Sequence, residues 1–437
     1  MKKIDFKYFT NILLRSEMLR NASILISGTV IAQMISILLQ PFLRRFFSPQ
    51  IFGIFSVYSS LIGIIIVIAS FRYDDAIVLP KTDKESANVL GLSIIFSFCF
   101  NALLFLIVIM MGGKIITFLN LPSTFPAWIL YVIPLSAFLY NSYQCFNYWL
   151  VRKRKFYAVS VNKLSRRGAE GISQVSFALL RNSNGLVYSD IIGQTVNVFT
   201  VIFQSIKNGL TFRFISFIKL KYVCNKYKDF PKYNLIPAFM STCGFMLPPI
   251  FINKFFSSDS LGFFNLAQML LSIPLGLVAA AFTNVLLQRI SEKFNNRTSF
   301  LSDLKPVIIV VGLISLIEII VITFFGEFLF KVVFGDIWTF SGRISKILVW
   351  SFAFNFIVST FTAIFVAMRK IKVYSVYQLF YFIAIISLLL FKRLGFVEFL
   401  KVYVTIEITC YAVLSAVMIY TITRYEHLLK TALQTDL

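Results

Sequence analysis

Residues 158–180, AVSVNKLSRRGAEGISQVSFALL, decide the fold of this chain of 437 residues. Only the second part of the stretch, residues 171–180, is uncharged, and at about 1.5 Å per residue it reaches half way across a membrane core of roughly 30 Å. If this part merged with the following apolar segment into one span, the lysine-rich segment after it would lie outside the cell. Lys and Arg are enriched in the cytoplasmic loops of membrane proteins, which argues against this arrangement. We therefore expect a separate helix that starts near Ala158 and carries its charges into the membrane.

The composition of the chain indicates a polytopic membrane protein. Hydrophobic residues make up 58% of the sequence and charged residues 14%, and the mean hydropathy is +0.80. At about 20 apolar residues per span, this is enough for about twelve spans. No polar stretch is long enough to bury a core of its own, which excludes a soluble enzyme with an added anchor.

We expect an all-α fold with about twelve transmembrane helices in two sets of six. With both termini inside, most of the basic residues lie in cytoplasmic segments, as the positive-inside rule requires. The first set of spans is 22–42, 51–71, 88–111, 127–150, 158–180 and 185–205, and the second is 234–253, 262–288, 305–325, 344–367, 373–391 and 399–421. The predicted organisation is a cytoplasmic amphipathic lead-in (1–21), an N-terminal six-helix bundle (22–205), a basic cytoplasmic linker (206–233), a C-terminal six-helix bundle (234–421) and a cytoplasmic tail (422–437).

A short motif recurs at a constant offset of 209 residues. Arg45-Phe46-Phe47-Ser48 followed by Phe52-Gly53 returns as Lys254-Phe255-Phe256-Ser257 followed by Leu261-Gly262. Each copy falls at the outer turn between the first two spans of its set. Because each set has an even number of spans, we expect two parallel repeats. The alternative is that aromatic and small residues simply crowd a turn at the membrane surface.

The charges of the fifth span lie on one helix face. Lys163, Arg166, Arg167 and Glu170 stand at i, i+3, i+4 and i+7. Because charges are costly at mid-membrane, we expect this face to line a water-filled cavity, where Arg and Lys suit an anionic substrate such as a diphosphate. The alternative, strongest for Lys163, is a cytoplasmic extension whose side chains reach the headgroups.

Three acidic residues lie within other predicted spans. Glu318 stands in the apolar run 314–321 with no cation one turn away, and Glu407 and Asp190 lie nearer span ends. Each is a candidate for coupling transport to a proton or another cation, and Glu318 is the expected coupling site. The alternative for each is a protonated or hydrogen-bonded side chain that holds helices together.

A charged cluster closes the second span on the cytoplasmic side. Arg72, Asp74 and Asp75 precede Pro80. These residues are candidates for a cytoplasmic gate that they would form with basic residues of other cytoplasmic loops. The alternative is that they end the helix and form local ion pairs.

Other classes of chemistry find no support in the sequence. The five cysteines have no paired spacing and there is a single histidine, so we expect no metal site and no disulfide framework. There is no phosphate-binding Gly-Lys-Ser/Thr loop and no base–nucleophile pair, so we expect neither an enzyme nor a cofactor. The net charge of +23 reflects cytoplasmic loops and anionic lipid rather than a nucleic acid partner.

Several local sequences are similar to those of bacterial polysaccharide-biosynthesis flippases of the O-antigen type. These are Phe71-Arg72-Tyr73-Asp74-Asp75-Ala76-Ile77-Val78-Leu79-Pro80, Ser27-Gly28-Thr29, Phe52-Gly53, and Leu266-Ala267-Gln268 with Pro274. The layout resembles the family over nearly the whole chain. The resemblance implies the superfamily that also holds multidrug and toxin extruders (MATE) and lipid II flippases, and hence a MATE-like fold.

The resemblance also implies a function and a location. It implies that a glycan on an undecaprenyl diphosphate carrier, such as an O-antigen unit of lipopolysaccharide, moves from the inner to the outer leaflet of the bacterial cytoplasmic membrane. Partners would be this lipid-linked oligosaccharide and membrane lipid, with a glycan polymerase and a chain-length regulator as open candidates. A central, partly cationic cavity and ion coupling are also implied. The alternatives are a drug or toxin extruder, expected to have an acidic cavity, and a membrane glycan polymerase, expected to have a large outer loop.

Overall fold

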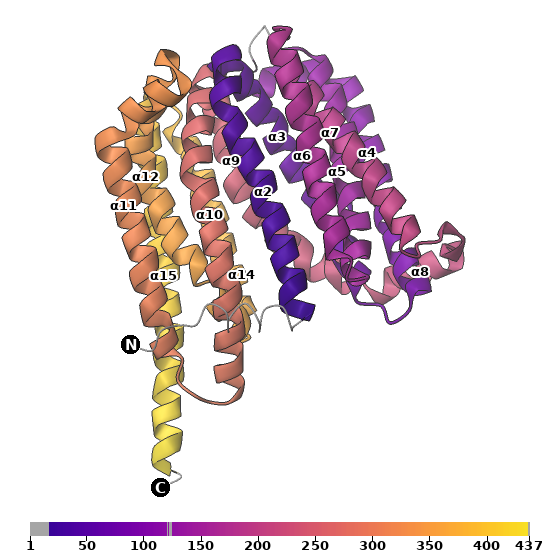
Figure 1. The fold of residues 1–437 in the computed structure, drawn as a ribbon, viewed down its shortest axis with the longest axis vertical. Helices are drawn as coiled ribbons and strands as arrows, with labels where there is room; N and C mark the ends of the chain where they lie inside the picture. The colour runs from indigo at the N-terminus through magenta and orange to yellow at the C-terminus, as the bar shows by residue number, and fades with distance from the viewer. Residues whose placement is uncertain (1–16, 120, 122–124, 436–437) are drawn as a thin grey trace. The chain divides into compact units, whose positions relative to one another are not determined.

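The computed structural model describes residues 17–119, 121 and 125–435, and these form helices joined by short connections (Figure 1). The chain divides between Thr242 and Cys243, within α9, into two compact units. Unit 1 holds α2 (Glu17–Phe46), α3 (Pro49–Ala69), η1 (Tyr73–Val78), α4 (Asp83–Leu119), α5 (Trp128–Arg152), α6 (Phe156–Leu179), α7 (Gly185–Lys207), η2 (Phe212–Phe214), α8 (Phe217–Lys226), η3 (Phe230–Asn234) and the start of α9 (Leu235–Phe255). Unit 2 holds the rest of α9, α10 (Ser258–Asn295), α11 (Leu301–Phe334), η4 (Asp336–Trp338), α12 (Thr339–Thr360), α13 (Ala363–Ala367), α14 (Ile371–Ile386), η5 (Ser387–Phe391) and α15 (Phe396–Thr435).

Every predicted span coincides with a helix, and the all-α membrane fold is confirmed. The span predicted at 344–367 is interrupted between α12 and α13, and the one at 373–391 ends in η5. Nine helices in the described part of the chain have the length and hydropathy of a membrane span. The predicted spans outside this group are α2, α5 and α6, so the total of twelve stays a prediction. Most of the predicted lead-in, residues 1–16, lies outside the described residues.

The repeated motif forms the same helix–turn–helix in both units. α2 ends at Phe46 and α9 at Phe255, while α3 begins at Pro49 and α10 at Ser258. Both pairs of boundaries are 209 residues apart, the offset found in the sequence. A chance gathering of aromatic residues would not reproduce both boundaries, so the structure favours the repeat.

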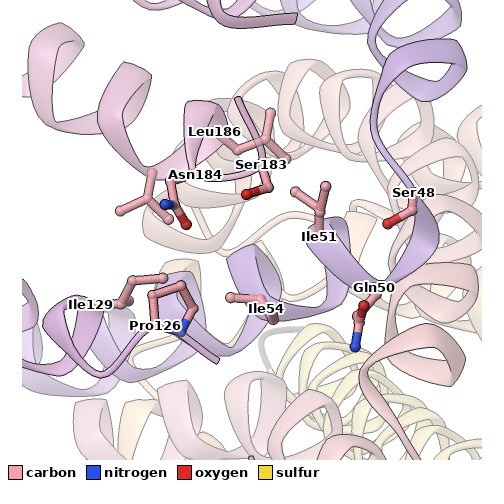
Figure 2. A pocket seen from close by; sticks show the side chains of 10 residues that line it. Ser48, Gln50, Ile51, Ile54, Pro126, Ile129, Ser183, Asn184 and Leu186 are labelled. Carbon is pink, nitrogen blue, oxygen red and sulfur yellow. The ribbon is translucent and has the colours of Figure 1, made fainter. Parts of the chain in front are cut away.

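The connections between the helices of unit 1 gather at its two ends. Helix α6 therefore runs the full length of unit 1, from one end to the other. At one end, Asp83 at the start of α4 pairs with Arg152 at the end of α5, and Glu85 pairs with Lys226 of α8. At the other end, the α2–α3 turn, the start of α5 and the α6–α7 turn surround a hollow of about 180 Å³ (Figure 2). Its lining is Ser48, Gln50, Ile51, Ile54, Pro126, Ile129, Ser183, Asn184, Leu186 and Val187.

Helices α2 and α6 approach each other closely because one contact residue has no side chain. A Cβ atom at Gly28 would lie 2.5 Å from the Cβ of Ser160, which is too close for any carbon pair. The Ser160 hydroxyl also donates a hydrogen bond to the Ile24 carbonyl at 2.9 Å. The Ser-Gly-Thr motif at 27–29 therefore positions the charged helix α6 against α2.

Candidate functional site

The charged face of α6 begins with a contact to α2. Lys163 Nζ donates a hydrogen bond to Thr29 Oγ1 at 2.8 Å, one residue after the close approach at Gly28. Lys163 is half-buried. Its ammonium group is therefore held beside α2 within the helix bundle of unit 1.

Arg166 lies at the centre of a buried hydrogen-bond network that joins four helices. Its guanidinium contacts the Tyr140 hydroxyl and lies 3.4 Å from Asp190 Oδ1. Tyr140 and Tyr58 donate hydrogen bonds to the Asp190 carboxylate at 2.9 and 3.0 Å. When its amide oxygen faces the network, Gln194 accepts from Arg166 Nη2 at 2.9 Å. Since the Asp190 side chain is only 4% exposed, Arg166 supplies the charge that a buried carboxylate requires.

Glu170 offsets the positive charge of the second arginine, Arg167. Arg167 Nη1 lies 2.8 Å from Glu170 Oε2, and Arg166 Nε lies 3.9 Å from the same oxygen. The cluster thus combines three cations with two carboxylates and keeps one excess positive charge. Arg167 is the more accessible arginine, with 29% of its side chain exposed against 19% for Arg166.

Sequence reasoning missed the uncharged members of this network. It grouped Asp190 with the coupling candidates, whereas the structure brings Asp190 together with Arg166. Tyr58, Tyr140 and Gln194 were not recognised as site residues. The available signal was the spacing of Asp190 and Gln194, which stand one helical turn apart within a predicted span and so share a face.

Unit 2 buries a carboxylate of a different kind on its last helix. Glu407 of α15 is 3% exposed and accepts hydrogen bonds from Tyr381 at 3.0 Å and Tyr411 at 3.3 Å. The Tyr411 hydroxyl in turn accepts from Asn355 Nδ2 at 2.7 Å. Among the residues that the structure describes, Glu407 makes no ion pair. Hydroxyl donors surround the carboxyl group of Glu407, where Asp190 has an arginine.

Glu318 lies on a mostly apolar face of α11. Val311, Ile314 and Ser315 precede it on the same face, and the first two belong to a cluster with residues of α10 and α12. Within the described residues, the buried Glu318 Oε2 has no hydrogen-bond partner. Burying a polar atom without a hydrogen-bond partner costs free energy.

The predicted gate residues form local contacts. Arg72 pairs with Asp75 at 2.6 Å, and Tyr148 also donates to Asp75 at 3.1 Å. Asp74 accepts a hydrogen bond from Ser70 at 2.6 Å, and burial raises the pKa of its carboxyl group. These contacts match the alternative of a helix end with local ion pairs.

Contacts between the predicted cytoplasmic segments come instead from two acids at the start of α4, which sequence reasoning did not single out. Asp83 pairs with Arg152 at 3.3 Å and also contacts Lys153. Glu85 pairs with Lys226 at 2.6 Å and accepts from Tyr227 at 2.9 Å. The hydrogen bond to Glu85 raises the pKa of Lys226, and burial together with that acid raises the pKa of Tyr227 to about 12.

Comparison with known proteins assigns the chain to a family. The family model described as polysaccharide biosynthesis protein matches residues 42–342. The chain belongs to this family. No curated protein matches the sequence. The resemblance noted in the sequence is thereby confirmed at the level of the family.

Solved structures of two transporter types share the fold of this family member. An inward-facing multidrug resistance MATE transporter of the MOP superfamily is 15% identical, with a TM-score of 0.72 over 90% of this chain and 96% of that one. The lipid II flippase MurJ, in an inward closed conformation, is 14% identical, with a TM-score of 0.70 over 95% and 93% of the two chains. Family and fold together support a multi-pass membrane protein of the flippase or exporter type.

Proposed function

We propose that the protein is a flippase for undecaprenyl-diphosphate-linked oligosaccharides, such as O-antigen repeat units, in the bacterial cytoplasmic membrane. It moves them from the inner to the outer leaflet by alternating access, with both chain termini in the cytoplasm. The family of polysaccharide biosynthesis proteins supports the substrate class, and the lipid II flippase with the same fold supports a lipid-linked cargo.

The charge excess on α6 is the observation that carries this proposal. Arg166 is occupied by Asp190 and its tyrosines, so it holds the network in shape. Arg167 is more exposed and shares Glu170, which leaves it free to exchange that carboxylate for a substrate phosphate. Lys163 adds a second cation on the same face. An anionic diphosphate matches such a face, because bidentate guanidinium contacts to phosphate are strong.

We assign ion coupling to the carboxylates that form no ion pair with a Lys or Arg side chain in the described part of the chain. Asp190 is charge-balanced by Arg166, whereas Glu407 and Glu318 form no ion pair in the described part of the chain. Of these two, Glu407 has hydroxyl donors that stabilise it after deprotonation, so it can both bind and release a proton. We therefore place proton coupling at Glu407 and regard Glu318 as the second candidate.

The decisive experiment is deletion of the gene in its host, followed by analysis of lipid-linked sugars and surface polysaccharide. We expect complete lipid-linked repeat units to accumulate while surface polymer disappears. Surface-exposed single repeats would instead identify a polymerase. An unchanged glycan profile with increased drug sensitivity would identify an extruder.

Complementation of the deletion tests the site. The variant Lys163→Gln/Arg167→Gln is expected to reach the membrane in normal amount and to reduce export at least about tenfold, because two charge-assisted contacts are lost. The matched control Lys392→Gln/Arg393→Gln removes two exposed cations elsewhere and should export normally. Normal export by the first variant would refute the role of the α6 face.

A further inference from the structure

The segment 212–233, here called the basic arm, follows α7. One of its faces packs on the rest of unit 1. Val223 of α8 is buried, and Leu220 and Tyr227 pack into the same hydrophobic cluster. The Tyr73 hydroxyl donates to the Cys224 carbonyl at 3.0 Å, and Lys226 pairs with Glu85. These contacts hold α8 at the end of unit 1 where α4 begins, as Figure 1 also shows.

The opposite face of α8 is apolar and exposed. The side chains of Phe217, Ile218 and Tyr222 are 84%, 81% and 57% exposed. Ile218 and Tyr222 stand one turn apart, on the side of the helix away from Leu220 and Val223. Large apolar side chains this exposed mark an interaction surface when they gather on one face.

Cations surround this apolar face. The basic arm contains six Lys and Arg residues and a single acid, Asp229. Lys219 and Lys221 flank Ile218, and Lys228 follows the helix, and all three are exposed. An apolar face rimmed by lysines is typical of helices that lie in the membrane interface, where each lysine is attracted to anionic headgroups.

We propose that the outer face of α8 docks onto the anionic phospholipid surface of the leaflet at this end of unit 1. Phe217 and Ile218 enter the interface, and Lys219, Lys221 and Lys228 bind lipid phosphates. The occupant is a lipid surface because α4, which begins beside α8, is itself long and apolar enough to span a membrane. The headgroup layer therefore lies at the level of this helix.

Labelling of the full-length protein in nanodiscs tests this proposal. The variant Ile218→Cys, with the native cysteines replaced by alanine, is treated with a membrane-impermeant maleimide. We expect labelling about tenfold slower in phosphatidylcholine with 30% phosphatidylglycerol than in phosphatidylcholine alone, with the difference lost in high salt. Adding Lys219→Gln/Lys221→Gln/Lys228→Gln should abolish the difference.

A matched control and two contrary outcomes complete the test. Asn296→Cys, exposed in the α10–α11 loop of unit 2, should label at the same rate in both lipids. Equal labelling of Ile218→Cys in both lipids would overturn the proposal. So would protection that appears only after a cytosolic extract is added, since the occupant would then be a protein. The assay measures no transport, so its result is independent of the proposed flippase function.

Discussion

At the scale of single residues, the two arginines of α6 differ in what surrounds them. Arg166 neutralises the buried Asp190, whereas Arg167 faces Glu170 from a more exposed position. We expect Arg166→Gln to lower the free energy of unfolding by about 3 kcal/mol, because an unpaired buried carboxylate remains. Arg167→Gln should cost less than Arg166→Gln, because Arg166 Nε remains 3.9 Å from the Glu170 carboxylate.

Thermal unfolding in detergent checks this difference, and a double variant tests its cause. Arg166→Gln/Asp190→Asn removes both charges and should recover most of the stability lost in Arg166→Gln. If the double variant were no more stable than the single one, the pair would not be the reason for the loss.

The proton-coupling assignment also belongs to this scale. Glu407→Gln keeps a side chain that can bond with Tyr381 and Tyr411 but removes the titration. We expect this variant to fold and to lose the response of flipping to an imposed pH gradient in proteoliposomes. Glu318→Gln is the comparison, and loss of the response there instead would transfer the assignment to Glu318.

At the scale of helices, close packing in unit 2 depends on Gly342. A Cβ atom there would lie 2.7 Å from Glu327 Cα and from the Gly326 carbonyl oxygen, so α12 packs directly on the backbone of α11. Gly342→Ala should cost about 1–3 kcal/mol through overpacking. Gly312→Ala, on the neighbouring helix α11 and with no atom within 4 Å of the added carbon, should cost nothing. Thermal unfolding distinguishes them, and equal midpoints would contradict the packing argument.

Helix positions were predictable from the sequence, but the partners of the charges were not. Apolar runs between charged clusters located each helix because membrane spans must satisfy this pattern, although several helices continue past the predicted span, α11 by 9 residues and α15 by 14 at their ends. The pairing of Arg166 with Asp190 joins residues of different helices, and no local periodicity encodes it. The Glu318 run was equally visible in sequence. Tyr411 stands one helical turn from Glu407 on α15, so their shared face was also readable from the sequence, whereas the hydroxyl group of Tyr381 comes from α14 and reaches Glu407 only after folding.

At the scale of the whole molecule, the path of α6 determines the number of spans. Its 24 residues correspond to about 36 Å, enough to cross the membrane core, although its charges make it too polar to be recognised by hydropathy. Within unit 1 the two arginines of α6 are paired with Asp190 and Glu170, so the cost of burying these charges is reduced. The α6–α7 turn also lies at the same end as the α2–α3 turn.

Reporter fusions test this path directly. Alkaline phosphatase, active only outside the cytoplasm, should be active when fused after Asn182 and inactive when fused after Asn208. If α6 did not cross, the fusion after Asn182 would be inactive and the one after Asn208 active, and the basic arm would lie outside. The two arrangements predict opposite activities for both fusions. One pair of fusions therefore decides whether α6 crosses, as twelve spans in two parallel halves require, or does not cross, which would leave an odd number of spans and break the repeat.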